Sequence, residues 1–130
     1  MAASSTPAAL HRMAESFLQL AREESDFGFD AKDIRRVRDA AEKGWLAILQ
    51  ATDAAMERQG VFPEPGARAH ITRHEFLEGV GRQDLSDALH MFADKLHGSY
   101  FYFGAVPDRR GMGVVLDEVA GYIRRVTEEL

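Results

Sequence analysis

The sequence contains no cysteine among its 130 residues. This absence excludes disulfide bonds, thiolate metal ligands and thiol nucleophiles, and it is typical of a protein in a reducing cytoplasm. No uninterrupted apolar run approaches the roughly 18 residues that a membrane-spanning helix needs. Met1–Pro7 has neither the basic region nor the apolar region of a secretion signal. We therefore expect a cytoplasmic protein that does not cross a membrane.

Positive charge is also scarce. The chain has 16 lysines and arginines against 21 aspartates and glutamates, a formal net charge of −5. Nonspecific binding to nucleic acid depends on neutralising phosphates, so this balance argues against it as the main activity. The hydrophobic share of 45% is ordinary for a globular protein, and a chain of this length can build one core. We expect a single domain over residues 1–130, with residues 1–6 as a flexible N-terminus.

Sustained alternation of apolar and polar residues, the pattern of strands, is absent. Apolar residues instead recur every three to four positions in long segments, which predicts amphipathic helices. The expected long helices cover residues 7–24, 31–59 and 84–102 and a last segment around Val115–Val126. A short additional helix is expected over Thr72–Val80. The pattern therefore predicts an all-α fold, a four-helix bundle with one short additional helix and no sheet.

Capping and breaking residues predict where these helices begin and end. Thr6, followed by proline, is expected to cap the first helix. The stretch Ser25–Phe29 contains a glycine and is expected to break that helix. Asp30 is then the expected cap of the second helix, with Asp33 in its first turn. Thr72–Glu75 has the spacing of a capping box, so the short helix is expected to begin there.

The stretch Leu85–Gly104 carries the clearest apolar stripe and most of the plausible chemistry. His97 lies near its end, and Arg109 follows in the next expected loop. A histidine and an arginine at the mouth of a bundle could perform acid–base chemistry on a phosphodiester. The alternative is a half-buried histidine bonded to a carbonyl or a carboxylate, and we favour it. We expect Tyr102 likewise to bury its ring and keep its hydroxyl bonded.

A dense set of aromatic residues surrounds this histidine in the sequence. The candidates for contact with a ligand or a partner are Tyr100, Phe101, Tyr102 and Arg110. Together with Arg109 they could form a small platform on which bases stack. Helical spacing places Tyr100 and Phe103 in the core stripe, however, so packing or a protein interface is the favoured interpretation.

His70 and His74 have the spacing, four residues apart, that two metal ligands on one helix require. Because Thr72 is the expected helix cap, His70 would lie outside the helix and the spacing would lose its meaning. We therefore predict no metal site and no cofactor.

Apolar residues that exceed the needs of one core predict self-association, most simply as a homodimer. The residues left over are Phe27, Phe29, Phe62, Phe101 and Tyr102. The small residues of Ala40–Ala47 would also let another helix come close. A homodimer, with a possible further protein partner, is the expected assembly.

The segment IRRVRDAAEKGWLAILQATDAAM is followed by a proline-containing loop and then by LHGSYFYFG. Leu96-His97, Phe101-Tyr102 and Gly104 match a leucine-histidine pair, two adjacent aromatics and a glycine. In these features the chain resembles a family of small bacterial proteins of unknown function related to the HEPN superfamily. The resemblance covers about Ile34–Val126. It implies an antiparallel up-and-down four-helix bundle that is commonly dimeric.

Many HEPN proteins are ribonucleases or pair with nucleotidyltransferases, and the nucleases carry an arginine followed after four to six residues by a histidine. Arg68 and His74 have five residues between them but fall in the expected loop and capping box. Arg82 and His90 have seven between them. The sequence therefore favours a non-catalytic module for self-association or protein interaction. The alternative is a metal-independent HEPN-like ribonuclease, or a nucleotidyltransferase partner, that uses His97 with Arg109 as its phosphate clamp.

Overall fold

The computed structural model describes residues 6–130, and these form helices and no strands. The prediction of an all-α fold is confirmed. Residues 1–5 of the expected flexible N-terminus lie outside the described residues, whereas Thr6 caps the first helix. None of the helices described is long and apolar enough to span a membrane. The elements in chain order are α1 (Pro7–Asp30), α2 (Ile34–Arg58), η1 (Gly66–Arg68), α3 (Ala69–Gly79), α4 (Gln83–Phe92), η2 (Ala93–Tyr102) and α5 (Arg109–Glu129).

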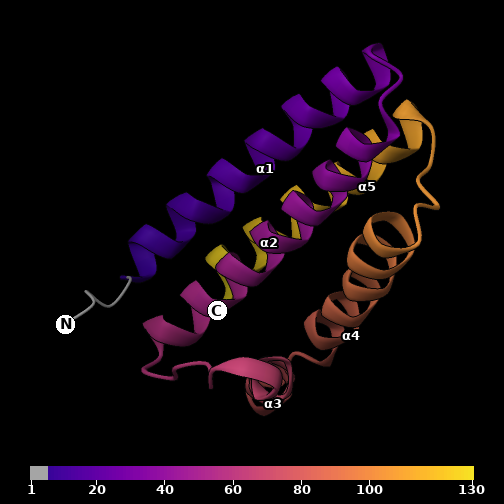
Figure 1. The fold of residues 1–130 in the computed structure, drawn as a ribbon. Helices are drawn as coiled ribbons and strands as arrows, with labels where there is room; N and C mark the ends of the chain where they lie inside the picture. The colour runs from indigo at the N-terminus through magenta and orange to yellow at the C-terminus, as the bar shows by residue number, and fades with distance from the viewer. Residues whose placement is uncertain (1–5) are drawn as a thin grey trace.

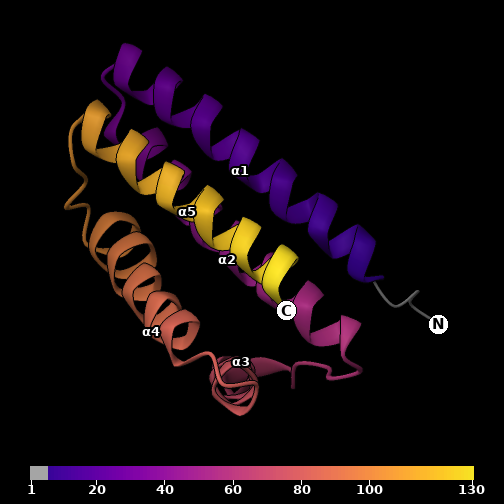
Figure 2. The same cartoon turned by 180° about the vertical axis from the view of Figure 1, so that it is seen from behind.

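Figures 1 and 2 show α1, α2 and α5 lying side by side along most of their length, consistent with the contacts among them. The continuous helix made by α4 and η2 lies across from α1, and η2 packs on α2. The short α3 crosses one end of the molecule between α2 and α4 (Figure 1). A salt bridge fixes α3 there, because Arg73 donates from Nε and Nη2 to the two carboxylate oxygens of Asp53 at 2.8 and 3.0 Å.

The core is built from the predicted stripes. In α4 and η2 the buried stripe residues are Leu85, Leu89, Phe92 and Leu96, and α5 contributes Val115, Leu116, Val119, Tyr122, Ile123 and Val126. One polar contact crosses this core, where the Tyr122 hydroxyl lies 2.8 Å from Thr52 Oγ1. Thr52 itself donates to the Ile48 carbonyl, so Tyr122 is the donor in this pair. Burial raises the pKa of Tyr122 to about 12, so its hydroxyl stays protonated at neutral pH.

The first helix is longer than predicted. Ser25–Phe29 does not break it, and α1 continues to Asp30. Gly28 is a packing residue, because a Cβ there would lie only 2.8 Å from Val37 Cγ2 on α2. The missing side chain lets two helices approach, a contact that the local sequence pattern does not reveal.

The caps of α1 and α2 were predicted with mixed success. The Thr6 hydroxyl accepts from the Ala9 amide at 3.0 Å, as predicted. Asp30 does not cap α2, since it still belongs to α1. Asp33 does so instead, accepting from the amides of Arg35 and Arg36. The chain reverses between the helices through Lys32, which has a positive φ of 53°.

The predicted start of the short helix is also wrong. It begins at Ala69, directly after the turn η1, so Thr72 lies inside α3. The Thr72 hydroxyl donates back to the Arg68 carbonyl at 2.9 Å instead of capping the amides that follow it. His70 and His74 therefore share one helix, contrary to the expectation that placed His70 outside it.

The small residues of α2 allow a close approach within the chain. Ala40, Ala41, Gly44 and Ala47 are all buried. A Cβ at Gly44 would lie 3.2 Å from Leu116 of α5. This face is therefore used within one chain, and its predicted role in a dimer interface is wrong.

The end of the central helix winds more widely than predicted. Residues Ala93–Tyr102 form a π-helix, and the Phe103 amide continues its pattern by bonding the Gly98 carbonyl, five residues earlier, at 3.0 Å. The wider turn shifts the inward-facing positions, so Phe103 is 82% exposed and Tyr102 is 67% exposed. The predictions that Phe103 joins the core and that Tyr102 buries its ring are therefore wrong.

Candidate functional site

His97 lies on η2 and is paired with Glu42 of α2. The distance from its Nδ1 to Glu42 Oε1 is 2.8 Å, and its side chain is 42% exposed. The imidazole stacks on Phe101, with 5.9 Å between ring centroids, and lies 6.3 Å from the Trp45 ring. His97 is thus a half-buried histidine bonded to a carboxylate, the arrangement expected if its role is structural.

Arg109 contacts α1. Within residues 6–130 no hydrogen bond or salt bridge links it to His97. Its guanidinium donates to the carboxylate of Asp30 and to the main-chain carbonyl of Asp26, and it lies 5.7 Å from the centre of the Phe29 ring. The hydrogen bond to Asp30 raises the pKa of Arg109. This arginine ties the start of α5 to the end of α1, which leaves the predicted phosphate clamp without support.

The four candidate contact residues differ in exposure. Tyr100 and Phe101 are half-buried, whereas Tyr102 and Arg110 are exposed. Burial raises the pKa of Tyr100, and the nearby Glu118 carboxylate raises it further. Within this aromatic set Tyr102 is open to solvent, as is the neighbouring Phe103.

Arg38 holds the end of η2, a role that the sequence analysis missed. Its Nε and Nη2 donate to the carbonyl oxygens of Phe101 and Tyr102, each at 2.9 Å. Gly104 follows with a positive φ of 73°, and a Cβ there would lie 3.3 Å from the Arg38 guanidinium carbon. The last carbonyls of a helix lack partners within it, so this arginine satisfies two of them.

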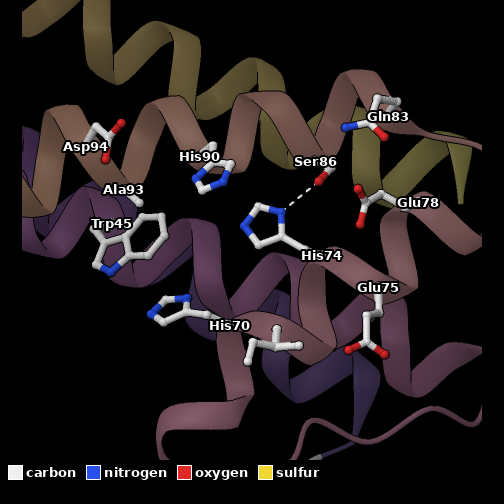
Figure 3. A pocket seen from close by; sticks show the side chains of 11 residues that line it. Trp45, His70, His74, Glu75, Glu78, Gln83, Ser86, His90, Ala93 and Asp94 are labelled. Carbon is white, nitrogen blue, oxygen red and sulfur yellow. Dashed lines mark hydrogen bonds between the residues drawn. The ribbon is translucent and has the colours of Figure 1, made fainter.

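A cavity of about 590 Å³ opens between α3 and α4, and the sequence analysis did not predict it (Figure 3). Its apolar wall is made by Trp45 of α2, Ile71 of α3 and Ala93 of η2. A cavity of this volume is within the range of small-molecule sites.

Three of the five histidines line this cavity: His70, His74 and His90. His74 Nδ1 lies 2.7 Å from the Ser86 hydroxyl, and the rings of His74 and His90 are 4.6 Å apart (Figure 3). His70 instead stacks on Trp45, with 5.7 Å between ring centroids. In residues 6–130 no group of three or more His, Cys, Asp or Glu side chains is arranged to hold a metal ion.

Burial lowers the pKa of both histidines of α3. For His70 the positive charge of Arg73 lowers the pKa further, and for His74 the neighbouring His90 does so. Both imidazoles are therefore neutral at pH 7, since a histidine with an ordinary pKa of about 6.5 is already mostly neutral there.

Comparison with protein-family models, with characterised proteins and with solved structures finds no match.

A signal for the cavity is present in the sequence. His70 and His74 are four residues apart on α3, and Ser86 and His90 are four residues apart on α4. Each pair lies on one face of its helix. Because Thr72 was the expected cap, His70 and His74 were not expected to share a helix. Nothing in the sequence indicates that the two helix faces meet.

Proposed function

We propose that the protein is a non-catalytic helical module that acts by self-association, as a homodimer paired through one exposed side of α1. The observation that carries the proposal is an exposed apolar stripe on this helix. Met13, Leu20 and Phe27 are spaced seven residues apart and are 41%, 46% and 54% exposed. Seven residues are close to two helical turns, so the three side chains form one line about 21 Å long.

This stripe is separate from the face of α1 that builds the core. The inward face carries Leu10, Ala14, Leu18 and Ala21, all buried. A surface helix with one apolar face buried ordinarily presents polar residues on its other side. A second apolar line, here on the side of α1 that borders Arg36 and Lys43 of α2, is therefore typical of a helix that another helix covers.

The shape of the stripe fits a second copy of the same chain. Ala9, Met13, Phe17 and Leu20 line a hollow of about 390 Å³ at one end. Phe27 lies at the other end, 54% exposed, with the Arg36 guanidinium 4.4 Å from its ring centre. In an antiparallel pair with its twofold axis at Leu20, Met13 of each copy faces Phe27 of the other. Each phenylalanine then fills the partner's hollow, the self-complementary arrangement that a twofold dimer requires.

Charge supports the same pairing. Arg12 and Asp26 each precede a residue of the stripe, lie on the same flank of α1 and are exposed. The antiparallel arrangement places Arg12 of each copy opposite Asp26 of the other. Two symmetric contacts between opposite charges favour this register over a parallel one.

The resemblance to HEPN-like proteins is part of the proposal. The alternating directions of α1, α2, α4 with η2, and α5 in Figure 1 support an antiparallel up-and-down four-helix bundle with α3 as the short additional helix. The alternative as a ribonuclease has less support, because His97 is bonded to Glu42 and Arg109 to Asp30. Arg68 and His74 have the motif spacing, with five residues between them, and His74 lies in a helix. The guanidinium of Arg68, however, is paired with Glu64.

Sedimentation velocity up to high micromolar concentration tests the proposal with two single variants. Leu20→Glu places two carboxylates face to face on the twofold axis and is expected to give a monomer. Val61→Glu introduces the same change at an exposed apolar residue in the loop after α2 and is expected to remain dimeric. Circular dichroism confirms that both variants fold. A wild-type protein that sediments only as a monomer would contradict the proposal.

A further inference from the structure

A second cavity, of about 480 Å³, lies between the start of α2 and the end of η2. Its lining residues are Arg35, Arg38 and Asp39 of α2 and Phe101 and Tyr102 of η2. The two aromatic residues are among those that the sequence singles out for contact with a ligand, and the proposed self-association uses neither of them. The volume is within the range of small-molecule sites.

Arg38 brings a positive charge to this cavity without a carboxylate partner. It is half-buried, and its Nε and Nη2 donate to the carbonyl oxygens of Phe101 and Tyr102, each at 2.9 Å. Within residues 6–130 no carboxylate forms a salt bridge with it. A guanidinium has five N–H donors, so these two bonds leave donors for an anion. Because the same bonds fix the side chain, an anion that binds here does not have to order it.

Arg35, one helical turn before Arg38, adds a second positive charge. It is exposed and forms no salt bridge within the described chain. Among residues 6–130 Asp39 is the only carboxylate that lines the cavity, and it forms no salt bridge with either arginine. The lining therefore carries one net positive charge, although the whole chain has a formal net charge of −5. This local balance favours an anion with a single negative charge.

Phe101 and Tyr102 form the aromatic wall of the cavity. Their rings are nearly perpendicular, with 86° between the planes and 6.2 Å between the centroids. His97 packs against both rings, at 5.9 and 5.7 Å between centroids, and is itself bonded to Glu42. These contacts hold the two rings in place. A planar ligand can pack on such a pair through stacked or edge-to-face contacts.

We propose that this cavity binds a small aromatic carboxylate. The carboxylate accepts hydrogen bonds from Arg35 and Arg38, and the aromatic ring of the ligand packs against Phe101 and Tyr102. None of the five lining residues belongs to α1. Binding is therefore independent of the proposed dimer, and each of the two proposals can fail without the other.

Titration of the amide signals by NMR with four small probes tests the ligand class. Benzoate, cyclohexanecarboxylate and benzyl alcohol have the same number of carbon atoms, but the second lacks the aromatic ring and the third lacks the charge. Phenyl phosphate keeps the ring and carries nearly two negative charges at neutral pH. We expect benzoate to bind about tenfold more tightly than benzyl alcohol and about threefold more tightly than the other two.

Shifts centred on the amides of Phe101–Gly104 would locate binding at this cavity. Benzoate that binds no more tightly than any one of the other three probes would overturn the proposal.

Three variants at exposed residues separate this site from general attraction to arginine. Arg35→Gln removes a positive charge from the lining and is expected to weaken benzoate binding about tenfold. Tyr102→Ala removes one aromatic ring and is expected to weaken benzoate binding more than cyclohexanecarboxylate binding. Arg124→Gln removes an exposed arginine of α5 that does not line the cavity, and is expected to leave the affinity unchanged. Circular dichroism confirms that the variants fold, and equal losses in Arg35→Gln and Arg124→Gln would overturn the site.

Discussion

Each of the two residues that the sequence offers for catalysis contacts a carboxylate from another helix. His97 on η2 bonds Glu42 on α2, and Arg109 on α5 bonds Asp30 on α1. Interactions of this kind between elements orient helices and satisfy polar groups at the edge of a core. The residue types alone did not distinguish this role from acid–base chemistry, because both use the same side chains.

Replacement of His97 tests its structural role. His97→Ala removes the bond to Glu42 and the stacking on Phe101, and we expect it to lower the free energy of unfolding by about 1–2 kcal/mol. Urea denaturation measures this change, and an assay with mixed RNA substrates is expected to show no cleavage by either protein. A catalytic His97 would give the opposite result, an unchanged stability together with RNA cleavage that the substitution abolishes.

His74, at the centre of the cavity, is expected to make the stability of the protein depend on pH. Burial lowers the pKa of His74 most, and the nearby His90 and then His70 lower it further, whereas Glu78 and Asp87 raise it. The unfolded chain, where this histidine keeps its ordinary pKa of about 6.5, therefore binds a proton first as the pH falls. His74 thus makes the free energy of unfolding decrease below about pH 7 until the folded pKa is passed.

His74→Gln removes this contribution and retains hydrogen-bonding capacity toward Ser86. Urea denaturation at about pH 7.5 and about pH 5.5 is expected to show a smaller loss of stability on acidification in the variant than in the wild type. An equal or larger loss in the variant would show that His74 is not held neutral by its surroundings.

At the scale of helices, the spacing of apolar residues predicted which face of a helix is buried, because local sequence encodes that face. The buried stripe of α5 agrees with its prediction residue by residue, because seven-residue and three-to-four-residue spacing directly reports one helical face. Helix ends were less predictable. The glycine at 28 is typical of a break, yet α1 continues through it, and Val37 of α2 packs where a side chain at this position would lie. Thr72 satisfies the capping pattern, yet α3 begins three residues earlier, at Ala69, directly after the turn η1.

The π-helical end of the central helix explains the largest error in exposure. Prediction assumed 3.6 residues per turn, so it placed Phe103 inside. In a π-helix the bonding partner is five residues away, which brings both Phe101 and Tyr102 beside His97, at 5.9 and 5.7 Å between ring centroids. No sequence motif indicated this change of winding.

Two glycines provide a matched test of the α1–α2 contact. Gly28→Ala is expected to destabilise the protein by about 1–3 kcal/mol, because its Cβ would collide with Val37. Gly121→Ala, inside α5, meets nothing within 4 Å and is expected to stabilise it by about 0.5–1 kcal/mol through helix propensity. Thermal melting measures both. Gly28→Ala melting above the wild type would refute the close contact.

At the scale of the whole molecule, the exposed stripe and the histidine-lined cavity occupy different elements. The exposed stripe lies on α1, whereas the cavity is lined by α3 and α4. Figure 1 shows these two helices across from α1. Pairing through α1 therefore leaves the cavity open to solvent. The stripe could have been read from the spacing of Met13, Leu20 and Phe27, but which of the two apolar faces of α1 turns inward depends on how the helices pack. The cavity depends on the meeting of two helices and was not predictable from either alone.

In the proposed dimer α1 pairs with a second copy in antiparallel register, and exchanging the charges of Arg12 and Asp26 tests this pairing most directly. The dissociation constant of the dimer is measured by sedimentation for Arg12→Glu, Asp26→Arg and the double variant. Each single variant opposes like charges at two symmetric contacts and is expected to weaken the dimer about 3- to 10-fold. The double variant restores opposite charges at both contacts and is expected to recover most of the wild-type affinity. A double variant that dissociates at least as readily as either single variant would contradict the antiparallel pairing.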